Sequence, residues 1–421
     1  MTGRNRREFL AGGVAAALTA SGAAPALAQG AGQPEKFDLV SKGGEVLDPS
    51  QNLRGRRDIG IRRGLVAAIE PEIPAARIGL SIDASGKVVV PGLVDLHTHV
   101  FPYGSGLGLP ADELVPYTCA TTMVSAGDAG ANNFAAFRRF IAAATRTRSY
   151  AFVHIANFGL AGFPVGEMLN IDHADVDACA RTIAQNADMA LGCKVRMTKN
   201  VVGANGLEPL RRAIAACERS GVPGAKVMCH IGDAPGQIGE VLDLLRPGDI
   251  LTHCYSGAGN NIVQDGKLVP AAKAAKERGV VFDIGHGGGS FDYTVAEVAI
   301  REGAPPDTIS SDIHAVSGNT PGMPFLPIVM AKFLNLGFSL EDVVRMATAA
   351  PAKVIGREPK LGTLAIGAPA DVAVLEIVEG PVSFVDTRNN RREGNRFIKP
   401  VQTIRAGIPF GRPFMQPFSP T

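Results

Sequence analysis

The chain has 421 residues, of which 42 are Lys or Arg and 40 are Asp or Glu, and its formal net charge is +2. This near balance, with no basic run interleaved with aromatic residues, argues against a nucleic-acid-binding protein, and the arginine cluster between Arg388 and Arg396 is read as a solvated loop. The six cysteines form no CxxC pair, so neither a disulfide scaffold nor a zinc ribbon is indicated.

The N-terminus predicts an export signal. Arg6-Arg7 precedes an Ala/Gly-rich, mildly apolar stretch that ends at Ala26-Leu27-Ala28, the pattern of a twin-arginine signal with its cleavage site. A membrane anchor, the alternative, would need a denser run of Leu, Ile and Phe. We therefore expect the twin-arginine export machinery as a partner, cleavage of residues 1–28, a periplasmic protein and no stable membrane span. Cleavage removes three Arg and one Glu, which takes Lys+Arg from 42 to 39 and Asp+Glu from 40 to 39.

Short strand-like runs separated by turn residues occupy both ends of the remaining chain. They cover residues 37–40, 58–61, 65–69 and 88–90 near the start, and 362–367, 371–375 and 402–407 near the end. Neither end shows a long helical period. Residues 29–90 and 356–421 are therefore predicted to build one small β-sandwich domain together.

The middle of the chain, residues 91–355, alternates apolar strand-like runs with Ala-rich helical segments. The helical segments include 134–144, 208–220, 271–279 and 340–349. Such a rhythm indicates repeated βα units and a parallel sheet, and the length is close to the ~250 residues of a (β/α)8 TIM barrel. The predicted fold class is therefore α/β, a barrel with a small second domain.

His97 and His99 follow the apolar run Val88-Val89-Val90 and the break Pro91-Gly92. Alternate residues of a strand share a face, so both imidazoles can reach one metal ion. By itself the pair is equally well explained as two core histidines with satisfied hydrogen bonds.

Further metal-capable residues close other apolar runs of the middle region, and the series is far more specific than any one member. They are Lys194, His230, His253 and Asp312. Catalytic groups of a (β/α)8 barrel sit where its strands end. Four imidazoles, one carboxylate and one buried lysine suit a pair of borderline cations such as zinc.

With these residues in place, the chain after the signal resembles the amidohydrolase superfamily. The likeness rests on the run from Val90 to His99 and on the order of the metal-capable residues. It also rests on the C-terminal segment that runs from Gly362-Thr363-Leu364 to Ala370-Asp371-Val372. The resemblance implies two divalent metal ions, zinc in the first place. It implies that His97, His99 and Asp312 hold one ion, that His230 and His253 hold the other, and that Lys194, carbamylated by carbon dioxide, bridges both.

The resemblance also implies a mechanism of hydrolysis. Two divalent ions lower the pKa of a shared water, and the resulting hydroxide is the nucleophile, while Asp312 acts as the general base that passes the proton to the leaving group. The alternatives are a salt bridge of Lys194 with Asp95, and an Asp312 that only caps a helix.

The closer likeness is to the dihydroorotase-like and deacetylase branch, through residues 121–130, Ile284-Gly285-His286-Gly287 and Ser311-Asp312-Ile313-His314. Dihydroorotases place an arginine two residues beyond the second histidine, where this chain has Phe101. The resemblance therefore favours amidohydrolases that remove acetyl groups from N-acyl amino acids or from O-acetyl 2-hydroxy acids such as acetyl-mandelate.

Substrate contacts are expected from loops, which leave weaker patterns. Arg196, two residues beyond Lys194, either pairs with a substrate carboxylate or neutralises a nearby acid. His286, in a glycine-rich loop, is expected to hydrogen-bond the leaving group or an acyl oxygen, with a structural role as the alternative. Asn157 is a weaker candidate. His314 is expected to orient Asp312, and His154 is assigned to the core.

Four functional classes follow from these observations. The leading one is a binuclear metal-dependent hydrolase of an amide or ester in a small-molecule substrate, in the first place a deacetylase. A cyclic amidase of the hydantoinase or dihydroorotase kind is the second, and a non-catalytic periplasmic scaffold of the same fold ranks last because all six ligands are present. A mononuclear deaminase is disfavoured, since Lys194 would then have no purpose. A homo-oligomer is left open.

Overall fold

The computed structural model describes residues 36–411 apart from Pro321, so the predicted signal peptide lies outside the described residues. Within this range a parallel sheet of seven strands runs in the order β14-β11-β10-β9-β8-β7-β6. β6 and β7 are buried along their whole length, as expected for parallel strands covered on both faces. The strands are β6 (Leu93–Thr98), β7 (Ala120–Gly130), β8 (Arg148–His154), β9 (Ala190–Met197), β10 (Lys226–Ile231), β11 (Ile250–Thr252) and β14 (Val281–Asp283).

A short irregular segment closes this sheet into a barrel. Thr308 bridges to Asp283 at the end of β14, and Ile313 bridges in parallel to Thr98 at the end of β6. The Asp312 amide donates to the His97 carbonyl at 2.7 Å, which ties the segment to β6. Residues 308–313 therefore stand in the place of the eighth strand, and the predicted (β/α)8 barrel is confirmed.

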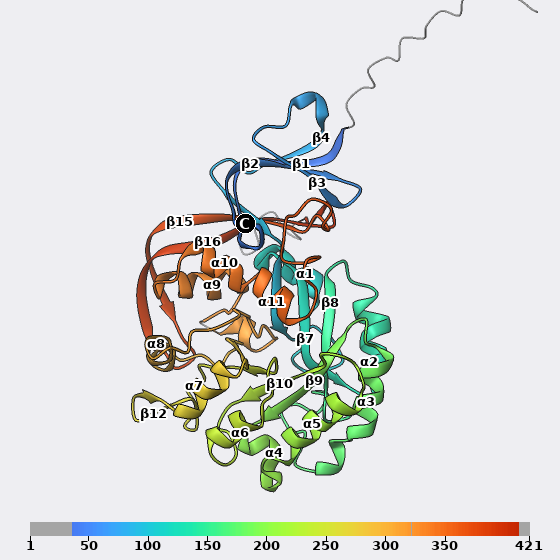
Figure 1. Ribbon diagram of the computed structural model, residues 1–421, viewed down its shortest axis with the longest axis vertical. Coiled ribbons are helices and arrows are strands. Elements are labelled where there is room, and N and C mark those ends of the chain that lie inside the picture. Colours follow the sequence, from blue (N-terminus) through green and yellow to red (C-terminus); the bar gives the residue numbers. More distant parts are fainter. Residues whose placement is uncertain (1–35, 321, 412–421) are drawn as a thin grey trace, which may run out of the picture. The chain divides into compact units, whose positions relative to one another are not determined.

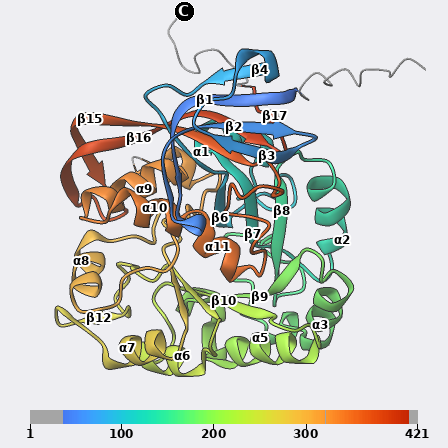
Figure 2. The ribbon, with the colours of Figure 1, turned by 45° about the horizontal axis from the view of Figure 1, so that its top comes forward.

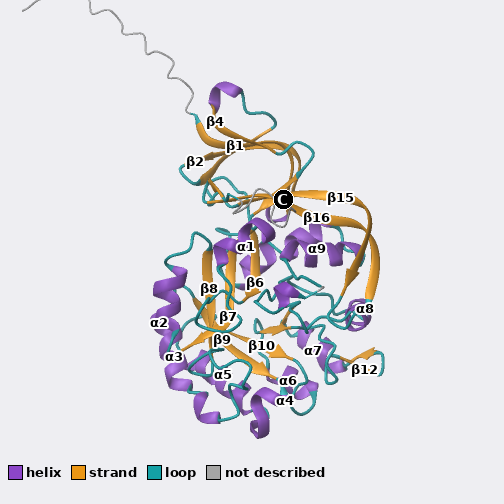
Figure 3. Ribbon diagram, turned by 180° about the vertical axis from the view of Figure 1, so that it is seen from behind, coloured by secondary structure: helices purple, strands orange, loops and turns teal. Residues whose placement is uncertain are grey.

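Helices surround the barrel strands, as Figure 3 shows. The predicted segment 208–220 is the helix Glu208–Arg219, whose apolar face packs on β9. The predicted segment 134–144 begins as a short α-helix and continues as π-helical turns over Phe137–Ala142. The helices are α1 (Ala111–Thr118), α2 (Phe134–Ala136), α3 (Val176–Gln185), α4 (Lys199–Val202), α5 (Glu208–Arg219), α6 (Ile238–Leu244), α7 (Pro270–Glu277), α8 (Tyr293–Arg301), α9 (Leu326–Asn335), α10 (Leu340–Met346) and α11 (Ala349–Val354).

Strands from both ends of the chain form the second sheet, which Figure 1 and Figure 2 show beside the barrel. β5 joins the two ends, because it pairs with β1 on one side and with β15 on the other. Residues of both ends, among them Val46, Ile59 and Val372, share one buried apolar cluster. The small β domain built from both chain ends is therefore confirmed; its strands follow the order β17-β16-β15-β5-β1-β2-β3, and β4 pairs with β1 off this path. The strands are β1 (Phe37–Asp48), β2 (Leu53–Arg62), β3 (Leu65–Glu70), β4 (Ile78–Asp83), β5 (Val88–Pro91), β15 (Val372–Val385), β16 (Arg391–Arg405) and β17 (Ile408–Pro409).

The hairpin of β15 and β16 is longer than the sequence indicated. It leaves the β domain and runs past α9 to α8 (Figure 1), and Asn335 of α9 donates to the Arg396 carbonyl at 2.7 Å. The assignment of the arginine cluster to a solvated loop is therefore wrong for residues 391–396, which lie in β16. Arg392 forms two hydrogen bonds with Glu297 of α8, at 2.6 and 2.9 Å. The strand was missed because its residues are mostly polar: it pairs with β15, and the hairpin packs against helices and not in the barrel core.

Two further observations bear on the predictions. All six cysteines are buried, and none of them forms a disulfide among the described residues. Among the helices of residues 36–411, none is both long and apolar enough to cross a lipid bilayer.

The remaining regular elements are a two-stranded hairpin of β12 (Val263–Gln264) and β13 (Lys267–Leu268), and short 3-10 turns at Pro49–Gln51, Ala75–Arg77, Ile171–His173, Gly203–Asn205 and Ser317–Asn319.

Candidate metal centre

The six donors predicted from the sequence lie at the carboxyl ends of the barrel strands. Since the ends of parallel strands meet at one rim, residues distant in sequence converge there. Five of the six are almost fully buried, and His230 is partly exposed. His97 lies in β6 and His99 directly after it; Lys194 lies in β9, His230 in β10, His253 directly after β11, and Asp312 in the segment that closes the barrel.

The donor atoms of this group are in contact. Lys194 Nζ lies 3.1 Å from His97 Nε2. Asp312 Oδ1 lies 3.3 Å from His97 Nε2 and 3.1 Å from His99 Nε2. His253 Nε2 lies 2.8 Å from His230 Nδ1. Donor atoms of His97, His253 and Asp312 all fall within 4.8 Å of one another, which is close enough for a shared metal ion.

Three of the imidazoles are oriented by a partner on their outer nitrogen. His99 Nδ1 lies 2.7 Å from Asp128 Oδ1, and His253 Nδ1 lies 2.5 Å from the Gly285 carbonyl. His97 Nδ1 lies 2.7 Å from Thr252 Oγ1, whose hydroxyl donates in turn to Asp283. An acceptor at Nδ1 keeps the proton there and leaves the Nε2 lone pair free, which is how proteins present histidine to a metal.

Buried carboxylates surround the centre. Asp128 accepts from His99, from the Val100 amide and from Ser125, and Asp283 accepts from three hydroxyl groups. Burial raises the pKa of Asp95 to about 7 and that of Asp283 to about 6. Burial alone would lower the pKa of His99, but Asp128 and Asp312 raise it to about 9. Burial, with the positive charge of neighbouring groups, lowers the pKa of His253 to about 4 and holds the pKa of His97 and of His230 well below the ordinary value, so these three imidazoles are neutral.

Lys194 is buried without a carboxylate partner among the residues that the structure describes. Its Nζ contacts His97 Nε2 at 3.1 Å and Met228 Sδ at 3.7 Å. The alternative of a salt bridge with Asp95 is not formed, because Asp95 accepts from the amide and the hydroxyl of Ser311. Burial lowers the pKa of Lys194 to about 8, against the opposing charge of Asp312.

Asp312 faces the centre and caps no helix. Its backbone has φ 50°, in the left-handed region, and its amide is bonded to the His97 carbonyl. Its carboxylate contacts His97 and His99 on one side. On the other side it fills the space beside Gly287, where a Cβ atom would collide with Asp312 Oδ2. Imidazole nitrogens and a carboxylate oxygen, ringed by further buried acids, fit borderline divalent cations such as zinc.

Residues 88–399 match the amidohydrolase family, which accounts for the barrel, the adjoining β5 strand and most of the long hairpin. The chain belongs to that family. Amidohydrolases generally use a binuclear metal centre, and the histidine and aspartate donors of this chain suit one.

Several relatives are similar over most of their length. A deacetylase of Agrobacterium fabrum is 34% identical over 339 residues, which cover 80% of this chain and 82% of that protein. The solved structure of an adenine deaminase superposes with a TM-score of 0.81 at 30% identity, covering 89% of this chain and 99% of that one. A dihydroorotase structure gives 0.80 at 30% identity, with 88% and 98% covered. This amidohydrolase is a hydrolytic enzyme that acts on C–N bonds.

A cavity of about 310 Å³ opens onto the centre of this amidohydrolase. Its wall combines polar groups, which include Arg196 and His314 beside the donors, with apolar side chains. It is lined by His99, Leu107, Leu160, Phe163, Lys194, Arg196, His230, Gly288, Gly289, Ser290, Asp312, His314 and Val316. A volume of this size suits a small molecule.

Arg196 lines the cavity and also pairs with a buried acid. Its position is therefore compatible both with binding a substrate carboxylate and with neutralising a nearby acid. Its Nη1 lies 3.2 and 3.1 Å from the two carboxylate oxygens of Glu167. His154 Nε2 lies 3.2 Å from the same carboxylate, and His154 Nδ1 accepts from the Ala156 amide. The histidine assigned to the core is thus buried in β8 and helps to hold the acid that holds Arg196.

The other substrate candidates lie away from the cavity wall. Both ring nitrogens of His286 are engaged, Nδ1 with the Gly287 carbonyl at 2.9 Å and Nε2 with Lys332 Nζ at 2.7 Å. The structure therefore favours the structural alternative for His286. Asn157 follows β8 and is bonded through its main chain to Asn132 and His173. His314 does line the cavity, and its ring centroid is 5.7 Å from that of His99.

Sequence reasoning missed the residues that orient the donors. Asp128 carried a signal, because it lies in the segment 121–130 that contributed to the family resemblance. Thr252 directly precedes His253 and was not singled out from the sequence, because a threonine at the end of an apolar strand is an ordinary core residue. Glu167 and Lys332 carried no signal, since each meets its partner only through the fold.

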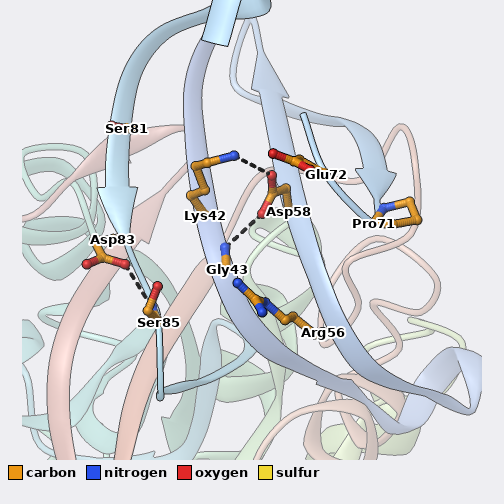
Figure 4. Close-up of a pocket in the computed structure, with 9 residues that line it drawn as sticks. All are labelled: Lys42, Gly43, Arg56, Asp58, Pro71, Glu72, Ser81, Asp83 and Ser85. Carbon is orange, nitrogen blue, oxygen red and sulfur yellow. Dashed lines mark hydrogen bonds and ion pairs between the residues drawn. The ribbon is translucent and has the colours of Figure 1, made fainter. Parts of the chain in front are cut away.

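A second hollow, of about 550 Å³, lies in the small β domain, and Figure 4 shows the residues that line it. Lys42 pairs with Asp58 at 3.2 Å, and the Gly43 amide donates to the same carboxylate at 2.7 Å. The Ser85 amide donates to Asp83 at 2.9 Å. None of the six donors lines this hollow, and several of its polar groups pair with one another, so we place the chemistry in the cavity at the barrel rim.

Proposed function

We propose that this amidohydrolase is a zinc-dependent deacetylase, which hydrolyses the acetyl group from an N-acyl amino acid or from an O-acetyl 2-hydroxy acid. The observation that carries the proposal is that four of the six donors line one cavity and the other two, His97 and His253, contact them from behind, while the same cavity holds an arginine suited to a carboxylate. The similarity to a deacetylase over four fifths of the chain supports it. Phe101, where dihydroorotases carry an arginine, is buried and packs against Phe137, with ring centroids 5.5 Å apart.

We assign His97, His99 and Asp312 to one metal ion and His230 and His253 to the other. When bound, the two ions supply a lowered pKa for a shared water and polarisation of the scissile carbonyl. The protein fixes the imidazoles for this task through Asp128, Thr252 and Gly285.

Lys194 is proposed to carry a carbamate. Its neutral amine attacks carbon dioxide, a C–N bond forms, one proton is released, and the product has two carboxylate-like oxygens that can bridge two cations. Two features support this: Lys194 is 1% exposed, and it lies between His97 and the cavity without a carboxylate partner among the described residues. A buried ammonium in that position is costly to desolvate, whereas a carbamate held by cations is compensated.

Asp312 is proposed as the general base. It lines the cavity, and its carboxylate is held between His97 and His99 on one side and the Gly287 main chain on the other. From this position it can accept a proton from the attacking water and deliver it to the leaving nitrogen or oxygen. Surrounding donors keep the pKa of Asp312 well below its ordinary value although burial opposes them, so the carboxylate starts in the form that accepts a proton.

Arg196 and the apolar wall define the substrate. Glu167 engages Nη1 of Arg196, so the rest of the guanidinium is available for a substrate carboxylate. Leu107, Leu160 and Val316 line the remainder and suit an apolar substituent on the acid. We therefore expect acetylated acids with an alkyl or aryl side group to be better substrates than acetylated amines without a carboxylate.

The test is metal content and a substrate screen on purified protein. We expect about two zinc ions per chain and hydrolysis of N-acetyl amino acids or acetylated 2-hydroxy acids, both lost in Lys194→Ala. Asp312→Asn should abolish hydrolysis. Asp175→Asn, at the N-terminus of α3 and away from the centre, is the matched control. Turnover of dihydroorotate or hydantoins alone would replace the deacetylase by a cyclic amidase, and one ion per chain would refute the bridged pair.

Export is a separate proposal. We propose that residues 1–28 direct this enzyme to the periplasm through the twin-arginine machinery, supported by Arg6-Arg7 and the cleavage pattern at residues 26–28. A fusion of residues 1–35 to a folded reporter should be exported in a host with this machinery. Replacement of both arginines by lysine should keep the reporter in the cytoplasm, and export of that variant would refute the proposal.

A further inference from the structure

A buried lysine that the proposed chemistry does not use lies on α9. Lys332 is 1% exposed. Its Nζ donates to His286 Nε2 at 2.7 Å and to the Val385 carbonyl at 2.8 Å. No carboxylate lies within ion-pair distance of this ammonium in residues 36–411, and an ammonium buried in this way is costly. The lysine therefore needs an explanation beyond packing.

Its first partner, His286, anchors a loop that touches the metal centre at several points. An ammonium can only donate, so His286 Nε2 accepts from Lys332, and the proton on Nδ1 is donated to the Gly287 carbonyl at 2.9 Å. The preceding residue, Gly285, supplies the carbonyl that orients His253. The following residue, Gly287, packs against Asp312, and residues 288–290 line the cavity.

Its second partner, Val385, is the last residue of β15, at the tip of the long hairpin. The tip is itself fixed to the barrel. Asp386 accepts from the Tyr293 amide at 2.9 Å, and Thr387 Oγ1 donates to the Phe291 carbonyl at 2.7 Å. Phe291 stacks on His286, with ring centroids 4.8 Å apart. The ammonium of Lys332 thus joins the hairpin tip to the loop at the metal centre.

We propose that Lys332 is a positioning residue, which through His286 fixes the loop 285–290 and with it the orientation of His253 and Asp312. The hairpin from the C-terminal part of the chain is then a working part of the site and not only an edge of the β domain. The inference rests on the proposed function only in taking His253 and Asp312 to be metal ligands. It adds a residue that contacts neither metal ligand nor substrate.

The experiment compares Lys332→Met with Lys332→Arg and with the matched control Lys226→Met. Lys226, at the start of β10 and the opposite end of the barrel, donates to the Gly224 carbonyl. Three quantities are measured: zinc affinity by competition with a chelator, kcat and KM on the best acetylated acid, and the melting temperature of the metal-free protein. In Lys332→Met we expect zinc affinity and kcat to fall about ten-fold, with a smaller change in KM. Lys332→Arg should restore part of both, and Lys226→Met should match the wild type.

A result in which Lys332→Met lowers only the melting temperature, with zinc affinity and kcat equal to those of Lys226→Met, would overturn the inference. Should Lys332→Met fail to fold, Asp386→Asn decides the matter, because it keeps Lys332 but loosens the tip; unchanged zinc affinity and kcat there would equally overturn it. A wild type that holds two zinc ions and hydrolyses no acetylated acid would refute the proposed function, while the zinc affinities would still decide the role of Lys332.

Discussion

Replacement of Glu167 by Gln tests whether the acid behind Arg196 sets up the substrate site. The wild-type carboxylate is buried and makes three polar contacts, two with Arg196 Nη1 at 3.2 and 3.1 Å and one with His154 Nε2 at 3.2 Å. Gln has nearly the same volume but carries no charge, and its amide group must face either Arg196 or His154, both of which are donors. The variant therefore loses a charged hydrogen bond, and the NH2 group of the new glutamine faces another donor, either Arg196 or His154.

The expected magnitude follows from burial. A hydrogen bond to a charged group contributes about 1.5–3 kcal/mol, and breaking a fully buried ion pair costs about 3–5 kcal/mol. Arg196 keeps 16% of its side chain exposed at the cavity, so water screens part of the loss. We expect the free energy of unfolding to fall by about 2 kcal/mol. The arginine should also become less ordered, which raises KM for a carboxylate substrate about ten-fold and leaves kcat nearly unchanged.

The assay is urea unfolding of the metal-loaded protein, together with kcat and KM on an acetylated acid and on its methyl ester. The control is Glu208→Gln, which removes an exposed ion pair with Arg212 on α5. If Glu167→Gln and Glu208→Gln unfold alike and share the wild-type KM, then Glu167 does not hold Arg196. An equal rise in KM for the acid and for its ester would also refute the reasoning, because the ester offers Arg196 no carboxylate.

Three further predictions follow from the same contacts. Asp128→Ala removes the acceptor of His99 Nδ1 and should weaken zinc binding about 10–100-fold, measured by competition with a chelator. Asp175→Ala is the control, and equal zinc affinities of the two variants would contradict the prediction. Burial raises the pKa of Glu167, but His154 and Arg196 outweigh burial and hold the pKa below its ordinary 4.5. The ionised Glu167 therefore stabilises the folded protein fully above pH 4.5, and this contribution is lost as the pH falls through the lower pKa of the folded state. The difference in unfolding free energy between wild type and Glu167→Gln should therefore be constant from pH 5 to 7 and shrink below pH 4.5, and a constant difference down to pH 3 would contradict this. Zinc at a free concentration 100 times its Kd should raise the free energy of unfolding by about 2.7 kcal/mol in thermal or urea unfolding, and in Lys194→Ala the same zinc concentration should add much less.

The six residues that we propose as metal ligands could be picked out from the sequence because each is encoded locally. His97 and His99 alternate on a strand, and Lys194, His230 and His253 each close an apolar run, so strand geometry alone brings them to one rim. Asp312 followed from its place in the same series. What the sequence could not show is that residues 308–313 form no regular strand, because φ 50° at Asp312 is imposed by contacts with β6.

Substrate and supporting residues were harder to predict, and His286 shows why. Its place in a glycine-rich loop after a strand-like run favoured a hydrogen bond to the substrate over a structural role. The fold instead buries it under Lys332 and Phe291 and uses both ring nitrogens. Glu167 lies in the loop between β8 and α3 and meets an arginine 29 residues away. Contacts of this kind do not recur at a regular spacing in the sequence, so no local sequence pattern predicts them.

The sequence by itself determined the barrel, the β domain from both ends and the six donor residues that meet at the barrel rim, because hydrophobic alternation and strand ends are local properties of the chain. Only the tertiary structure decided what surrounds the ligands: the carboxylates that orient the imidazoles, the Glu167–Arg196 pair, and the lysine that ties the β15–β16 hairpin to the loop 285–290. The physical reason is burial. Polar groups in the interior must find partners across the fold, and which partner each one finds depends on how distant elements pack.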